Sequence, residues 1–190
     1  MKALFLILIT GLTVGYNLNL KAENNLESDS LEVCKITSGF FEWYIKAIKG
    51  KQYTEFQPAF AQNQNGMATL DFTGYLENLR KYNFTDSLII KEKQSYDACI
   101  DNLGKVQYAD FKTNFVDLDD FEKAGCDFGN YYRWIGGQEP IDGIRIINVQ
   151  LMSKNLALVT IGYFNFDSEK NKYYYWGNNI VVLILSLIHI

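Results

Sequence analysis

Residues 141–184, IDGIRIINVQLMSKNLALVTIGYFNFDSEKNKYYYWGNNIVVLI, decide the fold class of this chain. They hold three runs that are rich in β-branched and aromatic side chains, which strands favour. The polar stretches SKN and DSEKNK separate the runs and are short enough to be turns. Because strands joined by short turns pair antiparallel, we expect an antiparallel sheet whose third strand begins at Tyr173.

Alternation in the first run separates an inner face from outward positions, because successive side chains of a strand point to opposite faces. The expected inner residues are Ile147, Val149 and Leu151. The polar residues at outward positions are Arg145, Asn148 and Gln150. The second run, LALVTIGYF, is apolar on both faces, so we expect a central strand that is covered on both sides.

A long apolar helix is expected over residues 31–49, where apolar side chains recur at helical spacing. Ser28 or Ser30 is placed to cap it, and Gly50 is a natural stop. Its second half, FFEWYIKAI, is apolar nearly all round, so other elements must cover it on more than one side.

Two further helices are expected before the strands, over residues 71–82 and 85–104, with Asp71 or Thr73 capping the first. Residues 51–70 are expected to form a long connection with one short helix. Helices first and antiparallel strands afterwards predict the α+β class, with N-terminal helices packed on a curved antiparallel sheet.

The N-terminus has the layout of a secretory signal peptide. Lys2 is followed by an apolar stretch from Ala3 to Val14 and by the small residue Ala22 before a polar segment. We expect residues 1–22 to be removed and residues 23–30 to be a polar lead-in. The apolar stretch is shorter than the roughly 20 residues of a bilayer span. The chain is therefore expected in the periplasm or outside the cell, with no stable membrane span after cleavage.

The C-terminus, NNIVVLILSLIHI, continues the third strand as far as Ile184. Its last six residues, 185–190, resemble the translation of a sequencing adapter, so His189 is expected to be foreign to the natural protein. On this interpretation residues 31–184 form one α+β domain that lacks its last strand or strands. The sheet is then left with an unpaired apolar edge.

Charge and composition exclude several kinds of function. The sequence holds 18 Lys and Arg against 22 Asp and Glu, and loss of Lys2 and Lys21 with the leader leaves 16 against 22, a formal net charge of −6. Nucleic acid is therefore not an expected partner, because its binding depends on clustered basic residues. A single histidine, three widely spaced cysteines and no glycine-rich phosphate loop leave no expected metal site or cofactor.

The cysteines are Cys34, Cys99 and Cys126, which in an oxidising compartment allow one disulfide in three pairings. We favour Cys99–Cys126, because Cys34 lies in an apolar helical segment where a small thiol packs well. The alternative is three reduced thiols.

Two stretches, CDFGNYYRWIGG and YYYWGNN, are dense in aromatic residues. They fit either a ligand pocket or binding rim, or ordinary core packing. The candidate lining residues are Trp43, Tyr44, Tyr131, Trp134 and Arg145. The acidic run DLDDFE lacks the glycine of a calcium loop and is expected to be a solvated loop or helix start. The candidate catalytic group is Asp127, as a carboxylate in an apolar cavity.

Four segments carry a family resemblance: the leader, FFEWYIKAI, GYLENLRKYNFTDSLIIKEKQSYDACIDNL and CDFGNYYRW. Together they resemble the exported bacterial family called domain of unknown function 3828, over residues 31–184. The resemblance implies the cystatin-like α+β fold of nuclear transport factor 2. It implies no activity, because a fold does not fix a function.

The favoured function is a non-catalytic exported domain that binds an unidentified small ligand or partner protein. One alternative is an acid/base hydrolase or isomerase that uses Asp127. Another is a periplasmic inhibitor or immunity-type protein, which predicts an exposed patch and no deep pocket.

Overall fold

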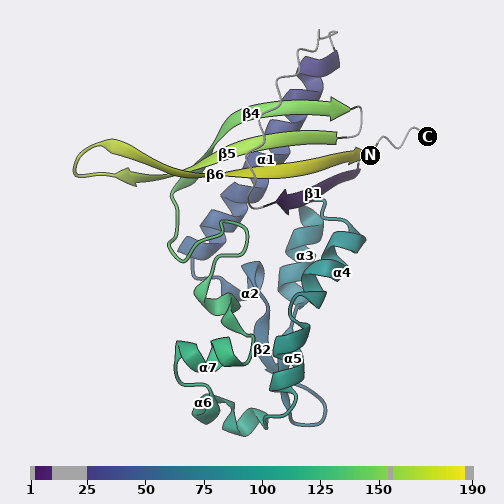
Figure 1. The fold of residues 1–190 in the computed structure, drawn as a ribbon, viewed down its shortest axis with the longest axis vertical. Helices are drawn as coiled ribbons and strands as arrows, with labels where there is room; N and C mark the ends of the chain where they lie inside the picture. The colour runs from purple at the N-terminus through teal and green to yellow at the C-terminus, as the bar shows by residue number, and fades with distance from the viewer. Residues whose placement is uncertain (1–2, 10–24, 154–155, 187–190) are drawn as a thin grey trace. The chain divides into compact units, whose positions relative to one another are not determined.

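A computed structural model describes residues 3–9, 25–153 and 156–186 (Figure 1). It confirms the α+β class. The chain divides into two compact units: unit 1 is Met1–Ile45, Tyr82–Thr85 and Ile141–Ile190, and unit 2 is Lys46–Lys81 and Asp86–Pro140. The expected domain 31–184 therefore contains two units, and helix α1 (Asn25–Lys49) runs across the division between them.

Unit 1 contains a four-stranded antiparallel sheet, and the three strands expected from the sequence are present. The strands are, in sheet order, β1 (Ala3–Ile9), β6 (Lys172–Ser186), β5 (Leu156–Asp167) and β4 (Gly143–Ser153). The stretch DSEKNK forms the turn between β5 and β6, as expected. Residues 154 and 155 of the other expected turn lie outside the described residues.

Strand β1 comes from the expected leader. It pairs antiparallel with the end of β6, from Ala3 opposite Ser186 to Ile9 opposite Ile180. This is the pairing of the uncleaved chain, and removal of residues 1–22 stays a prediction. Residues 10–24 and 187–190, the latter with His189, lie outside the described residues, so the adapter origin of 185–190 also stays a prediction.

Helix α1 packs on one face of this sheet (Figure 1). Alternate residues of β5 are buried on one face: Ala157, Val159, Ile161 and Tyr163. The large apolar side chains of α1 are buried as well, Phe40, Phe41 and Tyr44 at 1% exposure or less. Between these positions Leu158 and Thr160 are half-buried and Gly162 is buried, so the second face of the strand is less deeply covered than the inner face and the expected cover on both sides is met only in part. A single helix covers only one side of a sheet.

Strand β4 contains a bulge that the sequence did not reveal. Ile146 pairs with Ile161 and Asn148 with Thr160, which leaves Ile147 without an opposite residue. The side chain of Ile147 is 46% exposed, so its expected place on the inner face is wrong. An extra residue in one strand shifts the alternation by one position, which keeps Val149 on the half-buried side after the bulge.

Unit 2 is built from short helices and one small hairpin. Its elements are α2 (Tyr53–Phe56), β2 (Ala59–Gln62), β3 (Ala68–Asp71), α3 (Thr73–Lys81), α4 (Asp86–Gln94), α5 (Asp97–Leu103), η1 (Tyr108–Asp110), α6 (Phe111–Asn114), α7 (Leu118–Lys123) and η2 (Asp127–Asn130). The short helix α2 and helix α3 confirm two expectations. The hairpin of β2 and β3 was not expected, because strands of four residues carry little alternation.

Two helix boundaries differ from expectation. Helix α1 begins at Asn25, so Ser28 and Ser30 lie inside it and are not its caps, whereas its end before Gly50 is confirmed. The expected helix 85–104 is interrupted after Gln94 and divides into α4 and α5. Ser95 lies at the break, where its hydroxyl donates to the carbonyl oxygen of Glu92 at 2.6 Å. Such local side-chain bonds compete with a continuous helix.

Candidate functional site: an aromatic face on a hairpin

The hairpin of β5 and β6 continues beyond the start of β4 (Figure 1). The last pair between β4 and β5 is Gly143 with Phe164, whereas β5 and β6 pair as far as Asp167 with Lys172. The carboxylate of Asp167 accepts backbone N–H groups within the turn, which fixes the tip. A two-stranded ribbon, formed by the two inner strands, therefore extends beyond the end of the sheet.

One face of this ribbon carries four aromatic rings, from Phe164, Phe166, Tyr173 and Tyr175, which we call the aromatic face. Directly paired residues of two strands share a face, and here Phe164 pairs with Tyr175 and Phe166 with Tyr173. Their ring centroids are 5.9 and 4.8 Å apart, and Phe164 and Tyr173 lie 5.3 Å apart. The tyrosines are 51% and 53% exposed and Phe166 is 39% exposed. The rings support one another and still face solvent.

Arg145 completes the aromatic face from the neighbouring strand β4. Its guanidinium carbon lies 4.5 Å from the centroid of the Tyr175 ring, a cation–π arrangement. Arg145 itself is exposed. The stacked guanidinium keeps its N–H donors available for a further acceptor.

The absence of a side chain at Gly143 makes room for the Phe164 ring. A Cβ atom built on Gly143 would overlap the Phe164 ring, so a larger residue there would displace the ring. Gly143 and Arg145 are two positions apart on β4 and so lie on the same face. The aromatic face therefore depends on β4 at two points.

The opposite face of the ribbon has a different character. Tyr174 is 41% exposed there and carries the ammonium groups of Lys172 and Lys170, at 5.2 and 5.9 Å from its ring centroid. Trp176 packs at 5.5 Å against the buried ring of Tyr163. Unlike the aromatic face, this side has two lysines over one ring, Tyr174, and a second ring, Trp176, that packs against the core.

The aromatic face has the chemistry of a protein interface. Rigid aromatic side chains bury a large apolar area with little loss of rotamer freedom, and tyrosine hydroxyls and an arginine add directional hydrogen bonds. Tyrosine, phenylalanine and arginine are the residue types enriched at the centres of such interfaces.

The candidates from unit 1 have different places. Arg145 belongs to the aromatic face. From the sequence, the stretch YYYWGNN was a candidate binding region, but its contact with Arg145 was not predicted. Trp43 is half-buried in α1 and stacks on Tyr82, with centroids 5.0 Å apart. Tyr44 is 1% exposed and belongs to the core. Trp43 and Tyr44 therefore have structural roles that an apolar helix at this spacing already suggests.

The remaining candidates lie in unit 2. Tyr131 is 44% exposed, whereas Trp134 is 4% exposed and donates from its Nε1 to the hydroxyl of Tyr75 at 3.1 Å. The five expected lining residues are thus divided between the two units, and their role in lining a ligand pocket stays a prediction. Asp127 begins η2 and is exposed, so it is not the carboxylate in an apolar cavity that acid/base catalysis required.

Unit 2 also contains a buried polar network that is not among the residues predicted from the sequence, although the helical spacing of its central residue, Glu92, could have indicated it. Glu92 is 4% exposed, and its Oε1 accepts the hydroxyls of Tyr75 at 2.8 Å and Tyr96 at 3.2 Å. Its Oε2 accepts from Arg133 at 3.0 and 3.2 Å. Glu92 lies three positions after Ile89 and four before Tyr96, which is the spacing of a buried helix face. The satisfied network indicates a structural role.

The positive charge of Arg133 offsets the negative charge of Glu92 within this network. Burial lowers the pKa of Arg133, but the charge of Glu92 and the hydrogen bonds to it outweigh burial and raise that pKa overall. Arg133 therefore stays charged, and it gives the Glu92 carboxylate its counter-ion.

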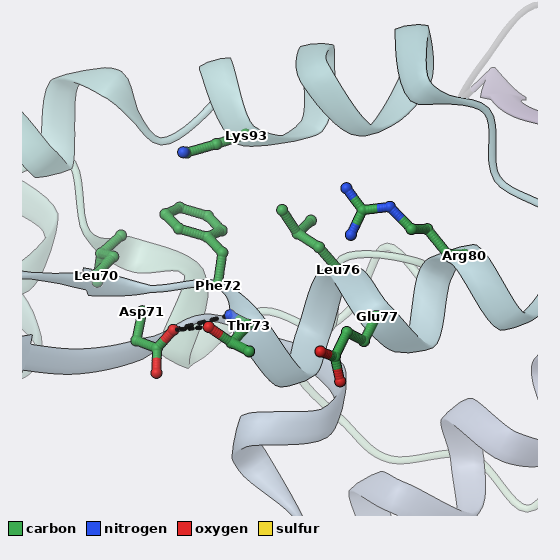
Figure 2. A pocket seen from close by; sticks show the side chains of 8 residues that line it. All are labelled: Leu70, Asp71, Phe72, Thr73, Leu76, Glu77, Arg80 and Lys93. Atoms are coloured by element: carbon green, nitrogen blue, oxygen red, sulfur yellow. Dashed lines mark hydrogen bonds between the residues drawn. The ribbon is translucent and has the colours of Figure 1, made fainter.

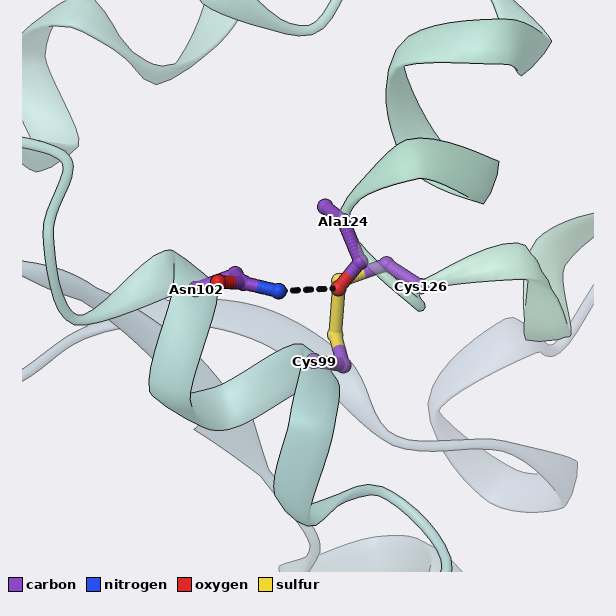
Figure 3. The surroundings of a disulfide bond; sticks show 4 residues. All are labelled: Cys99, Asn102, Ala124 and Cys126. Atoms are coloured by element: carbon purple, nitrogen blue, oxygen red, sulfur yellow. Dashed lines mark hydrogen bonds between the residues drawn. A yellow bond between two sulfur atoms is a disulfide. The ribbon is translucent and has the colours of Figure 1, made fainter.

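The disulfide between Cys99 and Cys126 confirms the favoured pairing (Figure 3). Both cysteines are buried, and their Cα atoms are 4.8 Å apart. Beside the bridge, the Asn102 side chain donates to the carbonyl oxygen of Ala124 at 3.2 Å. The bridge ties α5 to the segment between α7 and η2, and it agrees with an oxidising compartment. Cys34 is a free, half-buried thiol.

Within the described ranges, no helix is both long and apolar enough to cross a bilayer. In the same part of the chain, no three His, Cys, Asp or Glu side chains gather as metal ligands. Comparison of the chain with family models, with curated proteins and with solved structures gives no match.

Proposed function

We propose that this chain is an exported, non-catalytic binding domain that contacts a partner protein through the aromatic face and Arg145. The observation that carries the proposal is a connected set of four rings, three of them exposed and Phe164 half-buried, with a guanidinium stacked on Tyr175. A contiguous exposed apolar patch with polar groups at its border is typical of an interaction site.

The shape of the aromatic face favours a protein over a small ligand. Small-ligand sites are concave and surround most of the ligand, whereas rings side by side on a strand pair present a broad surface. A partner that covers the rings would bury their apolar area and meet the donors of Arg145. Tyrosine and arginine at the centre of an interface often account for most of the affinity.

Two observations support export. The leader layout of residues 1–22 predicts it, and the Cys99–Cys126 bridge is of the kind that persists outside the cytoplasm. An inhibitor or immunity-type protein is the more specific candidate, because the site is an exposed patch. The partner distinguishes a general binding domain from an inhibitor. If the partner is an enzyme or toxin and its activity falls when this chain binds, the chain is an inhibitor.

The test uses the full chain, expressed in an exporting bacterium with the photoreactive residue p-benzoylphenylalanine in place of Tyr175. A second chain carries the same residue in place of Tyr174, on the opposite face of the ribbon. We expect a specific protein crosslink from position 175 and little from position 174. Equal crosslinking from both positions, or from neither, would contradict the proposal.

The captured partner is then purified and titrated calorimetrically against variants. Tyr175→Ala is expected to weaken binding about thirtyfold, which corresponds to about 2 kcal/mol. Arg145→Ala is expected to weaken it less, and Tyr174→Ala is the matched control that should bind as the unaltered chain does. A Tyr174→Ala loss as large as that of Tyr175→Ala would place the interface elsewhere.

A further inference from the structure

Unit 2 contains an open hollow of about 420 Å³ between α3 and α4 (Figure 2). This volume is within the range of sites for small organic molecules. The hollow is separate from the aromatic face, which belongs to unit 1, and it has no part in the function proposed above.

The floor of the hollow is an apolar strip. It consists of Leu70 at the end of β3, Phe72, and Leu76 in the first half of α3, each less than 10% exposed. The ring of Phe72 is held edge-to-face against Tyr96 at 5.4 Å, so the floor is fixed before any ligand arrives. A preformed apolar floor lowers the entropic cost of binding.

Two cations reach over this strip. The ammonium of Lys93, from α4, lies 5.6 Å from the centroid of the Phe72 ring. Arg80, from the last turn of α3, extends its guanidinium toward the same side of the strip beside Leu76 (Figure 2). Within the described part of the chain, neither cation forms an ion pair. Both positive charges are therefore available to a ligand.

The two acidic residues of the lining do not neutralise this side. Asp71 accepts the backbone N–H of Thr73 at 2.8 Å and its hydroxyl at 2.7 Å. These bonds lower the pKa of Asp71 and occupy one of its oxygens. Glu77 directs its carboxylate away from α4, to the other side of the strip from Arg80 and Lys93 (Figure 2). The side that faces α4 is thus positive over an apolar floor.

We propose that this hollow binds a small organic carboxylate. The apolar body of the ligand would lie on Phe72 and Leu76, and its carboxylate would meet Arg80 and Lys93. Inorganic anions would not use the floor, and an organic cation would be repelled by the two charges above it. The combination therefore selects for an anionic group on an apolar body.

The test compares three probes of equal chain length on the ¹⁵N-labelled full chain: hexanoate, 1-hexanol and hexylammonium. We expect hexanoate to shift the amide resonances of Phe72, Leu76, Arg80 and Lys93 at millimolar concentration. The neutral alcohol should bind several-fold more weakly, and hexylammonium should leave these resonances unchanged. Stronger binding of hexylammonium than of hexanoate, or hexanoate shifts confined to other residues, would overturn the proposal.

Charge variants distinguish specific binding of the carboxylate by Arg80 and Lys93 from non-specific apolar binding. Arg80→Gln and Lys93→Gln are each expected to weaken hexanoate binding roughly three- to fivefold, the usual effect of one exposed charge. Arg80→Lys should retain most of the affinity. Lys91→Gln, on the same helix α4 but outside the lining, is the matched control and should have no effect. Equal loss with Lys91→Gln would reduce the effect to net charge and overturn the site.

A last variant controls for weaker binding that is caused by loss of the folded structure. Glu77→Gln removes a negative charge from the lining and should tighten hexanoate about twofold, which loss of structure cannot produce. Weaker binding by Glu77→Gln would mean that the site does not select anions.

Discussion

The guanidinium of Arg133 donates two hydrogen bonds, at 3.0 and 3.2 Å, to a single oxygen of Glu92, a residue 41 positions earlier in the chain. The side chain of Glu92 is 3% exposed and that of Arg133 45% exposed. Loss of the cation would leave a buried carboxylate with two tyrosine hydroxyls but no counter-ion. The pair thus joins α4 to the segment after η2 by charge as well as by packing.

We expect Arg133→Met to lower the free energy of unfolding by about 1–3 kcal/mol, less than for a fully buried pair because water already reaches the arginine. Methionine keeps the apolar stem, so the loss reports the charge. Urea unfolding, followed by tryptophan fluorescence, measures it. Lys91→Met on the exposed side of α4 is the control and should change stability by less than about 0.5 kcal/mol. If both variants lose the same free energy of unfolding, Arg133 has no specific role as the counter-ion of Glu92.

The disulfide should contribute strongly to stability. It closes a sequence separation of 27 residues, for which the chain-entropy relation gives about 3–4 kcal/mol. The double variant Cys99→Ser, Cys126→Ser is expected to unfold at correspondingly lower urea concentration. The free thiol gives the control, because Cys34→Ser should cost much less. A wild-type chain that resists urea equally with and without dithiothreitol would contradict this expectation.

Gly143→Ala should disturb the aromatic face from beneath. The new methyl group would occupy the place of the Phe164 ring, and the ring has to move, at a cost of about 1–3 kcal/mol. Gly39 provides a control of opposite sign in the same unit. Among the residues that the structure describes, no atom outside the neighbouring backbone of α1 lies within 4 Å of a Cβ built there, so Gly39→Ala should stabilise the helix by about 0.5–1 kcal/mol.

The double variant Gly143→Ala, Phe164→Leu tests the cause, because the smaller side chain leaves room for the methyl group. It should recover part of the loss of Gly143→Ala, as thermal unfolding would show. A double variant whose loss equals the sum of the two single losses would mean that the Phe164 ring is not the obstacle.

The ribbon should weaken in acid. Asp167 accepts the backbone N–H of Lys170 and forms an ion pair with its ammonium at 3.2 Å, and these interactions lower the pKa of Asp167 from 3.8. A lowered pKa means that the contribution to stability is complete above the unfolded value, about 3.9, and is lost as the pH falls through the folded value. The turn is therefore expected to loosen below about pH 4.

Hydrogen exchange measures this locally, through the protection of the amides of Glu169 and Lys170, which both donate to Asp167, between pH 6 and pH 2.5. Protection in the unaltered chain should fall with pH relative to Asp167→Asn, in which no proton binds at this position. Parallel pH profiles for the two proteins would exclude Asp167 as the titrating group.

Patterns that repeat along one element were readable from the sequence. Alternation and turn composition predicted three strands, because β-branched and aromatic runs with polar breaks have few other solutions. The helical spacing of FFEWYIKAI predicted its burial, and Phe41 is 0% exposed. The Cys99–Cys126 pairing was also predicted, because the alternative thiol, Cys34, fits an apolar helix.

Only the tertiary structure decided which side chains meet. The order of β4, β5 and β6 follows from their short turns, but the contact of Arg145 with Tyr175 depends on the register of these strands, which no local pattern gives. The bulge at Ile147 is invisible in the sequence, since it arises where two strands must stay in register with the same core. The spacing of Glu92 from Ile89 and Tyr96 is compatible with a buried helix face, but its partners Tyr75 and Arg133 come from distant segments that only the tertiary structure brings to it. Local periodicity fixes which face of an element is apolar, whereas the partners of that face depend on how distant segments pack.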